Sequence, residues 1–119
     1  MKKILLVEDN DMNRDMISRL LKRWGYEVVT AMDGRTAVEK VSSERPDLVL
    51  MDITLPGIDG IEATTRIRVL PEGERLPIIA LTAHVLDEDR ERAMNAGCND
   101  FETKPIDFQK LEQKIVAYI

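Results

Sequence analysis

The sequence has few residues that could form cross-links or large aromatic clusters. Cys98 is the single cysteine among 119 residues, so an internal disulfide is excluded and the composition fits a reducing cytoplasm. With one tryptophan, two tyrosines and two phenylalanines, the core is expected to be aliphatic. The apolar run at residues 4–7 is too short for a signal peptide or a membrane span. We therefore expect a soluble, cytoplasmic protein.

The charge balance is acidic, with a net charge of −5 and an isoelectric point near 4.9. Binding to nucleic acid or to an anionic membrane requires a basic face, so neither partner is expected. A chain of 119 residues is long enough for one domain with a buried core. We expect that domain to fill residues 1–119, without a DNA-binding output domain.

Apolar runs alternate with helical patterns along the chain. The runs show little polar alternation, which is typical of strands covered on both faces of a parallel sheet. We predict strands over residues 4–7, 26–31, 48–52, 77–81 and 99–103. Helices are predicted over residues 11–24, 34–45, 61–70 and 87–95, and from 108 onward. This alternation indicates a doubly wound α/β fold in which a five-stranded parallel sheet is flanked by five helices. The first and third strands should be central, and the second and fifth should form the edges.

Hydrophobic spacing also predicts a buried side for each helix. In the first helix, Met12 and Met16 are expected in the core, and Gly25 is expected to end the helix. In the last helix, Asp107 is expected to cap the N-terminus. The residues expected to be buried there are Phe108, Leu111, Ile115 and Val116.

Side chains suited to one chemistry follow four of the predicted strands: Glu8 and Asp9, Asp52, Thr82, and Lys104. A single aspartate at the end of one strand is more often a turn residue than a reactive group. In open parallel sheets, however, ligands bind at the carboxyl edge. Three carboxylates gathered there call for a cation, most naturally Mg²⁺, while a hydroxyl and an ammonium group can bind phosphoryl oxygens. Asp52 is then a candidate nucleophile that forms an acyl phosphate.

Other reactive residues favour plainer roles. His84 has no histidine or cysteine at ligand spacing, so we expect a partly exposed residue that shields the rim of the phosphoryl site. Cys98 follows Gly97 and is expected to be a small packing residue. The charged run at residues 87–92 is either a solvated helix face or part of a partner surface.

Short motifs at the strand ends carry a resemblance that covers the whole chain. They are ILLVEDN at residues 4–10, LMD at 50–52, LPGIDG at 55–60, IALTA at 79–83 and KP at 104–105. The chain resembles the receiver domains of two-component response regulators, including single-domain members and the receivers of hybrid histidine kinases. The resemblance implies a flavodoxin-like receiver fold with strand order 2-1-3-4-5.

The resemblance also implies roles for single residues. Asp52 is implied to accept a phosphoryl group from a phosphohistidine of a histidine kinase or of a histidine phosphotransfer domain. Mg²⁺ is implied to be held by Asp9, by Asp52, by the backbone carbonyl of Thr54 and, through its water, by Glu8. The phosphoryl oxygens are implied to contact Thr82, the backbone N–H of Ala83, and Lys104.

A conformational switch is implied by the same resemblance. Phosphorylation draws the Thr82 hydroxyl inward, and Phe101 rotates into the vacated space. This changes the surface of the fourth helix, fifth strand and fifth helix for a downstream protein target, with a monomer or a phosphorylation-dependent dimer as the assembly. Thr54 and His84 occupy positions that tune the phosphoryl lifetime, and the bond from Lys104 to Pro105 is implied to be cis.

Two positions depart from the family pattern. Glu8 stands where many relatives have aspartate, and its longer side chain is expected to shift the outer shell of the metal without abolishing binding. Phe101 stands where tyrosine is common. The missing hydroxyl suggests a switch that rests on burial alone.

Two other functions fit parts of the sequence. Phosphatases with an aspartyl-phosphate intermediate usually carry a second aspartate two residues after the nucleophile, but Thr54 occupies that position and cannot act as a general acid. A phosphorylation-independent adaptor would have no need of the intact acceptor, metal and lysine set. We therefore expect a signalling module that catalyses only its own phosphorylation and dephosphorylation.

Overall fold

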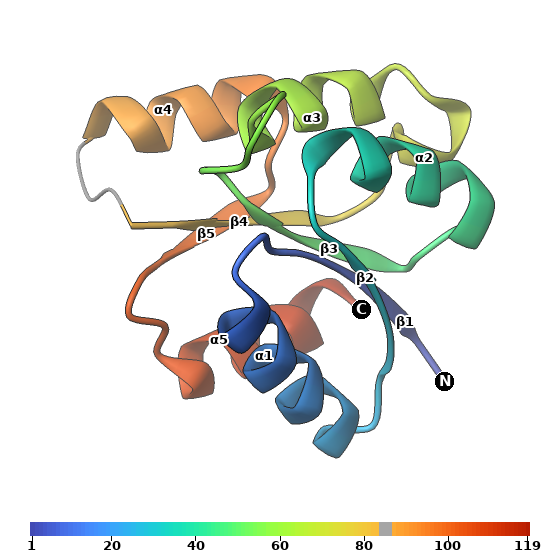
Figure 1. Cartoon of the computed structure of the whole chain (residues 1–119), viewed down its shortest axis with the longest axis vertical. Coiled ribbons are helices and arrows are strands. Elements are labelled where there is room, and N and C mark those ends of the chain that lie inside the picture. The colour runs from blue at the N-terminus through green and yellow to red at the C-terminus, as the bar shows by residue number, and fades with distance from the viewer. Residues whose placement is uncertain (84–86) are drawn as a thin grey trace.

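Strands and helices alternate strictly in the computed structural model, which describes residues 1–83 and 87–119 (Figure 1). The strands are β1 (Lys3–Val7), β2 (Glu27–Ala31), β3 (Leu48–Asp52), β4 (Ile78–Thr82) and β5 (Asp100–Thr103). The helices are α1 (Asp11–Arg23), α2 (Gly34–Glu44), α3 (Gly60–Arg68), α4 (Asp87–Ala96) and α5 (Phe108–Tyr118), with a 3₁₀ turn, η1 (Pro71–Gly73), after α3.

The strands form one parallel sheet in the order β2-β1-β3-β4-β5. Figure 1 shows α2, α3 and α4 on one face of the sheet and α1 and α5 on the other. The predicted doubly wound, flavodoxin-like fold is therefore confirmed. β2 and β5 are the edge strands, as the mixed polarity of their sequences predicted.

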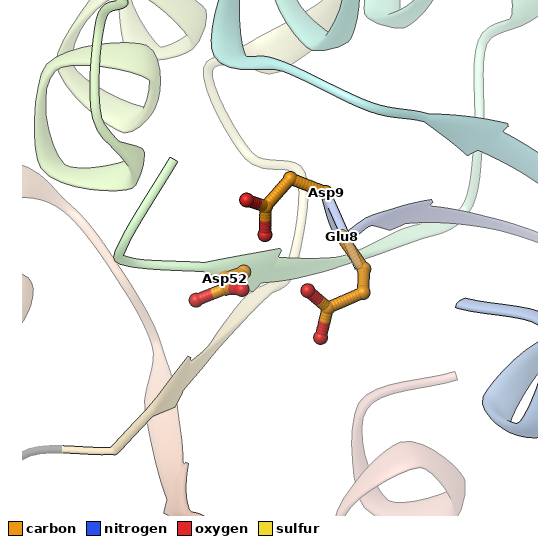
Figure 2. A group of neighbouring side chains, drawn as sticks. All are labelled: Glu8, Asp9 and Asp52. Atoms are coloured by element: carbon orange, nitrogen blue, oxygen red, sulfur yellow. The ribbon is translucent and has the colours of Figure 1, made fainter. Parts of the chain in front are cut away.

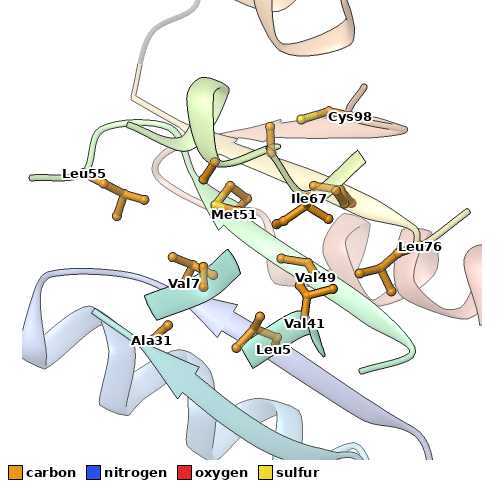
Figure 3. Close-up of a cluster of buried hydrophobic side chains, with 14 of the residues drawn as sticks. Leu5, Val7, Ala31, Val41, Val49, Met51, Leu55, Ile67, Leu76 and Cys98 are labelled. Carbon is orange, nitrogen blue, oxygen red and sulfur yellow. The ribbon is translucent and has the colours of Figure 1, made fainter. Parts of the chain in front are cut away.

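Two hydrophobic cores explain why the central strands are apolar without alternation. In β1, Leu5 and Val7 face the core under α2 and α3, whereas Ile4 and Leu6 face the core under α1 and α5. Figure 3 shows the first of these cores, in which Val7 lies near side chains of β3. Because both faces are covered, every residue of β3 is buried.

Polar side chains and a glycine set the helix ends. Four helices begin after a residue whose side chain accepts a backbone N–H of the first turn. These caps are Asn10, Asp33, Asp59 and Asp107, so the predicted cap of α5 is confirmed. Gly25 follows α1 with a φ of 98°, a left-handed conformation that glycine adopts without strain. None of the described helices is long and apolar enough to cross a membrane.

The predicted burial was wrong at three helical positions. Met12 and Met16 are 82% and 49% exposed, and Val116 is 63% exposed. Each helix contacts the sheet with only one narrow stripe of side chains. In α1 that stripe is built on Ile17 and Leu21, and both methionines lie well to the side of it around the helix, so they are exposed.

Candidate functional site

Three carboxylates converge at the carboxyl edge of the sheet, as Figure 2 shows for Glu8, Asp9 and Asp52. The parallel register places Val7 at the end of β1 beside Met51 of β3, so the residues that follow them meet. One carboxylate oxygen from each of the three side chains lies within 4.8 Å of the others. The predicted cluster is therefore present, assembled from two strands more than forty positions apart.

Lys104 reaches this cluster from the end of β5. Its Nζ atom lies 3.0 Å from Oε1 of Glu8 and 3.2 Å from Oδ2 of Asp52. Its backbone N–H donates to the carbonyl oxygen of Thr82 at 2.7 Å, and the following bond to Pro105 is cis. The lysine is thus fixed at its backbone and at its charged end. The carboxylates of Glu8 and Asp52 that it contacts are almost fully buried.

The charges at the site do not balance, since three carboxylates face one ammonium group. Burial alone would lower the pKa of Lys104. The hydrogen bond to Glu8 and the charges of Asp52 and Glu8 outweigh that effect, so its pKa lies above the ordinary value. The excess of negative charge and the hard oxygen donors fit a divalent cation such as Mg²⁺. Asp9 is exposed, so the cluster is open to solvent on its side.

The loop after β3 fixes the orientation of Asp52. The backbone N–H of Thr54 donates to Oδ1 of Asp52 at 3.0 Å, while Oδ2 accepts from Lys104. The loop then returns so closely that a Cβ atom on Gly60 would lie 2.2 Å from the carbonyl oxygen of Asp52. Glycine is therefore required at position 60. The sequence motif includes this glycine but does not show why it is needed.

Two supporting contacts were not predicted from the sequence. The backbone N–H of Asn10 donates to Oε2 of Glu8 at 3.2 Å, and the Arg14 guanidinium donates to the Glu8 carbonyl oxygen at 3.1 Å. Both donors lie at the start of α1, so this helix holds the glutamate in place. The sequence shows that Arg14 lies in the first turn of the helix after β1, but its partner is a backbone atom that no motif reveals.

The remaining predicted residues lie around the same edge. Thr82 ends β4 and is buried, and Ala83 follows it at the surface. Thr54 is exposed beside Asp52, and Phe101 is partly buried on β5. The position predicted for His84 lies outside the described residues. Cys98 is buried against Thr64, with 3.7 Å between Sγ and Oγ1, so its predicted packing role is confirmed.

Comparison with known proteins agrees with this geometry. Residues 4–116 match the family model of the response regulator receiver domain. The receiver domain of a sensor histidine kinase from Pseudomonas aeruginosa PAO1, solved with a magnesium ion coordinated in its active-site cleft, is 43% identical, with a TM-score of 0.92, and the match covers 98% of this chain and 96% of that one. Chemotaxis protein CheY4 of Vibrio cholerae is 30% identical, with a TM-score of 0.94 and coverage of 100% and 99%.

Curated relatives include both short and long proteins. The polar-differentiation response regulator DivK of Brucella anthropi is 35% identical over 99% of this chain and 96% of its own length. The sensor protein GacS of Pseudomonas syringae is 41% identical over 98% of this chain, which spans only 13% of that protein. The motifs, the fold and the acidic edge of the sheet lead to the same conclusion: the chain belongs to the family of response regulator receiver domains that serve two-component signalling.

Proposed function

We propose that the chain accepts a phosphoryl group on Asp52 from a phosphohistidine in a Mg²⁺-dependent reaction. The chain itself would catalyse only its own phosphorylation and dephosphorylation. The observation that carries this proposal is the joint placement of Asp52, the other two carboxylates and Lys104 at one open edge of the sheet. A carboxylate that is fixed by a backbone N–H on one oxygen and by a lysine on the other is oriented for attack at phosphorus.

In the proposed transfer, a carboxylate oxygen of Asp52 forms a bond to phosphorus as the bond from phosphorus to the donor imidazole nitrogen breaks. The electron pair of that bond returns to the imidazole. Lys104 moves from its two carboxylate partners toward the phosphoryl oxygens, joined by the Thr82 hydroxyl and the backbone N–H of Ala83. Asp9, Asp52 and the backbone carbonyl of Thr54, with Glu8 acting through a water, would hold Mg²⁺, which would supply positive charge to offset that of the carboxylates and the phosphoryl oxygens.

The donor is proposed to be a histidine kinase or a histidine phosphotransfer domain. Support comes from a cavity of about 280 Å³ beside the site, in which Glu8 and Lys104 meet the apolar side chains of Met16, Ile106 and Phe108. Since Met16 is half exposed, the reactive edge continues into an apolar surface of α1 and α5. Such a surface suits a donor that must dock before it transfers the group.

The consequence of phosphorylation is proposed to be an inward rotation of Phe101 toward Thr82. This rotation would change the shape of the surface formed by α4, β5 and α5, which a downstream protein target or a second copy of the chain then recognises. Phosphorylation turns the singly charged Asp52 carboxylate into an acyl phosphate with nearly two negative charges, beside the carboxylates of Glu8 and Asp9, so the local rearrangement has a clear electrostatic cause.

The test is intact mass spectrometry after incubation with phosphoramidate and Mg²⁺. One phosphoryl adduct is expected on the wild type and none on Asp52→Ala, and chelation of Mg²⁺ with EDTA should suppress the adduct. Asp9→Asn, which alters the acidic cluster, should slow adduct formation. Asp100→Asn is the matched control, because Asp100 is an acidic residue of the same sheet outside the cluster, and it should form the adduct as wild type does.

Each other result has a defined meaning. An adduct on both wild type and Asp52→Ala would place the acceptor elsewhere and reject the proposal. No adduct on either protein would move the function to a phosphorylation-independent adaptor. If the adduct forms on wild type alone, its rate of decay shows whether the chain is a short-lived switch or a relay intermediate.

A further inference from the structure

Two cations from different helices lie against the ring of Phe101. The Cζ atom of Arg90, on α4, lies 4.2 Å from the ring centroid, and Nζ of Lys114, on α5, lies 5.4 Å from it. Figure 1 shows β5 at the edge of the sheet, with α4 on one face and α5 on the other. Phe101 is therefore the point at which side chains from both helix layers meet.

Lys114 is firmly held in this position. Its Nζ atom lies 3.1 Å from Oδ1 of Asp100 and 2.8 Å from Oε1 of Glu102, and it donates to the carbonyl oxygen of Phe101 at 2.6 Å. Glu102 is buried, so its carboxylate needs this charged partner. Arg90, in contrast, is exposed and comes from a helix with few buried side chains.

These contacts favour one position of the ring over others. Cations are attracted to the negative face of an aromatic ring, and the attraction requires the cation to lie over that face. A ring that rotates toward the interior moves away from the exposed guanidinium of Arg90. The Lys114 ammonium is tied to β5 itself and cannot follow freely.

We infer that Arg90 and Lys114 are positioning residues that clasp the Phe101 ring in its partly exposed position and so oppose the rotation that activates the domain. This inference rests on the proposed function, because the rotation is part of it. Arg90 is the half of the clasp that can be removed with least disturbance, since it is exposed, whereas Lys114 also pairs with Asp100 and Glu102. A contact of this kind at a partly exposed site is expected to shift the ratio of inward to outward states by about two- to fivefold.

The test uses Arg90→Met, with Arg92→Met as the matched control. Arg92 has the same charge on the same helix, but it lies near Asp89, with 4.0 Å between Nη1 and Oδ1. Backbone amide resonances of Thr82 and Lys104 are recorded for each unphosphorylated protein by NMR. The positions of unphosphorylated and phosphoramidate-treated wild type define a line between the two states. Arg90→Met is expected to move both resonances along this line, with an inward-to-outward ratio about two- to fivefold higher.

The Phe101→Leu background provides the second comparison. Without the ring, Arg90→Met should no longer move the resonances. Resonances of Arg90→Met that stay at their wild-type positions would overturn the inference, and so would equal movement in Arg92→Met, which would indicate a general effect of charge.

A failure of the proposed function can be told apart from a failure of the clasp. If wild type forms no adduct, the line has no phosphorylated end and the proposed function fails. A double-mutant cycle of Arg90→Met and Phe101→Leu, measured by urea unfolding, then decides the clasp alone. A coupling of about two- to fivefold in the unfolding constant supports it, and additive effects reject it.

Discussion

Two lysines near the end of the chain form almost the same local arrangement. Lys104 lies between Glu8 and Asp52, at 3.0 and 3.2 Å, and Lys114 lies between Asp100 and Glu102, at 3.1 and 2.8 Å. In both clusters one ammonium group bridges two carboxylates, at least one of which is buried. Burial lowers the pKa of both lysines, but the hydrogen bonds and charges of the carboxylates raise it by a larger amount. Both pKa values therefore lie above the ordinary one.

The two clusters differ in what surrounds them. Beside Lys104 a third carboxylate, Asp9, adds unbalanced negative charge. Beside Lys114 the fourth group is a neutral backbone carbonyl, that of Phe101. The first cluster therefore has two excess negative charges, which suit a cation, whereas the second has only one and links β5 to α5. We therefore expect different roles for the two lysines, because the excess of negative charge around them differs.

The largest expected difference between the clusters lies in the rate of phosphorylation. Lys104→Met should slow adduct formation from phosphoramidate by about 100-fold or more, because it removes a charged donor to the phosphoryl oxygens. Lys114→Met acts only through the Phe101 clasp and should change the rate by about fivefold at most. Time courses of intact mass measure both rates. Equal slowing by the two substitutions would show that the clusters are not functionally distinct.

Mg²⁺ should change the free energy of unfolding of variants in the two clusters by different amounts. Lys114→Met leaves the buried carboxylate of Glu102 without its charged partner and should lower the free energy of unfolding by about 1–3 kcal/mol. Lys104→Met should cost a similar amount without metal, but a smaller amount with Mg²⁺, which replaces the lost positive charge. Urea unfolding with Mg²⁺ and with EDTA tests this. A Lys114→Met protein that Mg²⁺ restores to wild-type stability would contradict the assignment.

Removal of one carboxylate should sharpen the same contrast. Mg²⁺ at 100 times its dissociation constant stabilises the folded state by about 2.7 kcal/mol, and a tenfold weaker site would give about 1.4 kcal/mol at the same concentration. We expect that reduction for Asp9→Asn, while Asp100→Asn should retain the full wild-type gain. Thermal unfolding at several Mg²⁺ concentrations provides the measurement. An equal loss for the two variants would place the metal elsewhere.

The reactive cluster could be predicted from the sequence, and the structural one could not. Glu8, Asp52 and Lys104 each stand at the end of a predicted strand, and the carboxyl ends of parallel strands must meet at one edge. Lys114 instead meets β5 from the middle of a helix. Its partners depend on how α5 packs and rotates against the sheet, which local hydrophobic spacing determines only roughly. The same uncertainty produced the error at Met12, Met16 and Val116.

Backbone partners were equally hidden from sequence reasoning. The Arg68 guanidinium at the end of α3 donates to the carbonyl oxygens of Gly73, Leu76 and Gly97 and to the side chain of Asn99. It thereby ties together the connections around β4. A carbonyl oxygen is present at every position of the chain, so no residue type marks the ones that a distant arginine will reach.

The smallest expected effect is a loss of stability at alkaline pH. Unfolded lysine has a pKa of about 10.4, and both lysines have raised pKa values in the folded state. Above that pH the unfolded chain releases protons that the folded chain keeps. The stabilisation from each cluster is therefore complete below about pH 10.4 and is lost as the pH rises through the folded pKa.

Lys104→Arg and Lys114→Arg are the matched variants, because arginine keeps its charge over this range. Each should reduce the decline in unfolding free energy between about pH 10 and 12, by up to about 1 kcal/mol, since both lysines are partly exposed. Burial and the nearby Glu112 raise the pKa of Tyr26, so some alkaline decline remains in every variant and the slopes must be compared. Slopes equal to that of wild type in both arginine variants would show that neither cluster contributes to stability through its lysine charge.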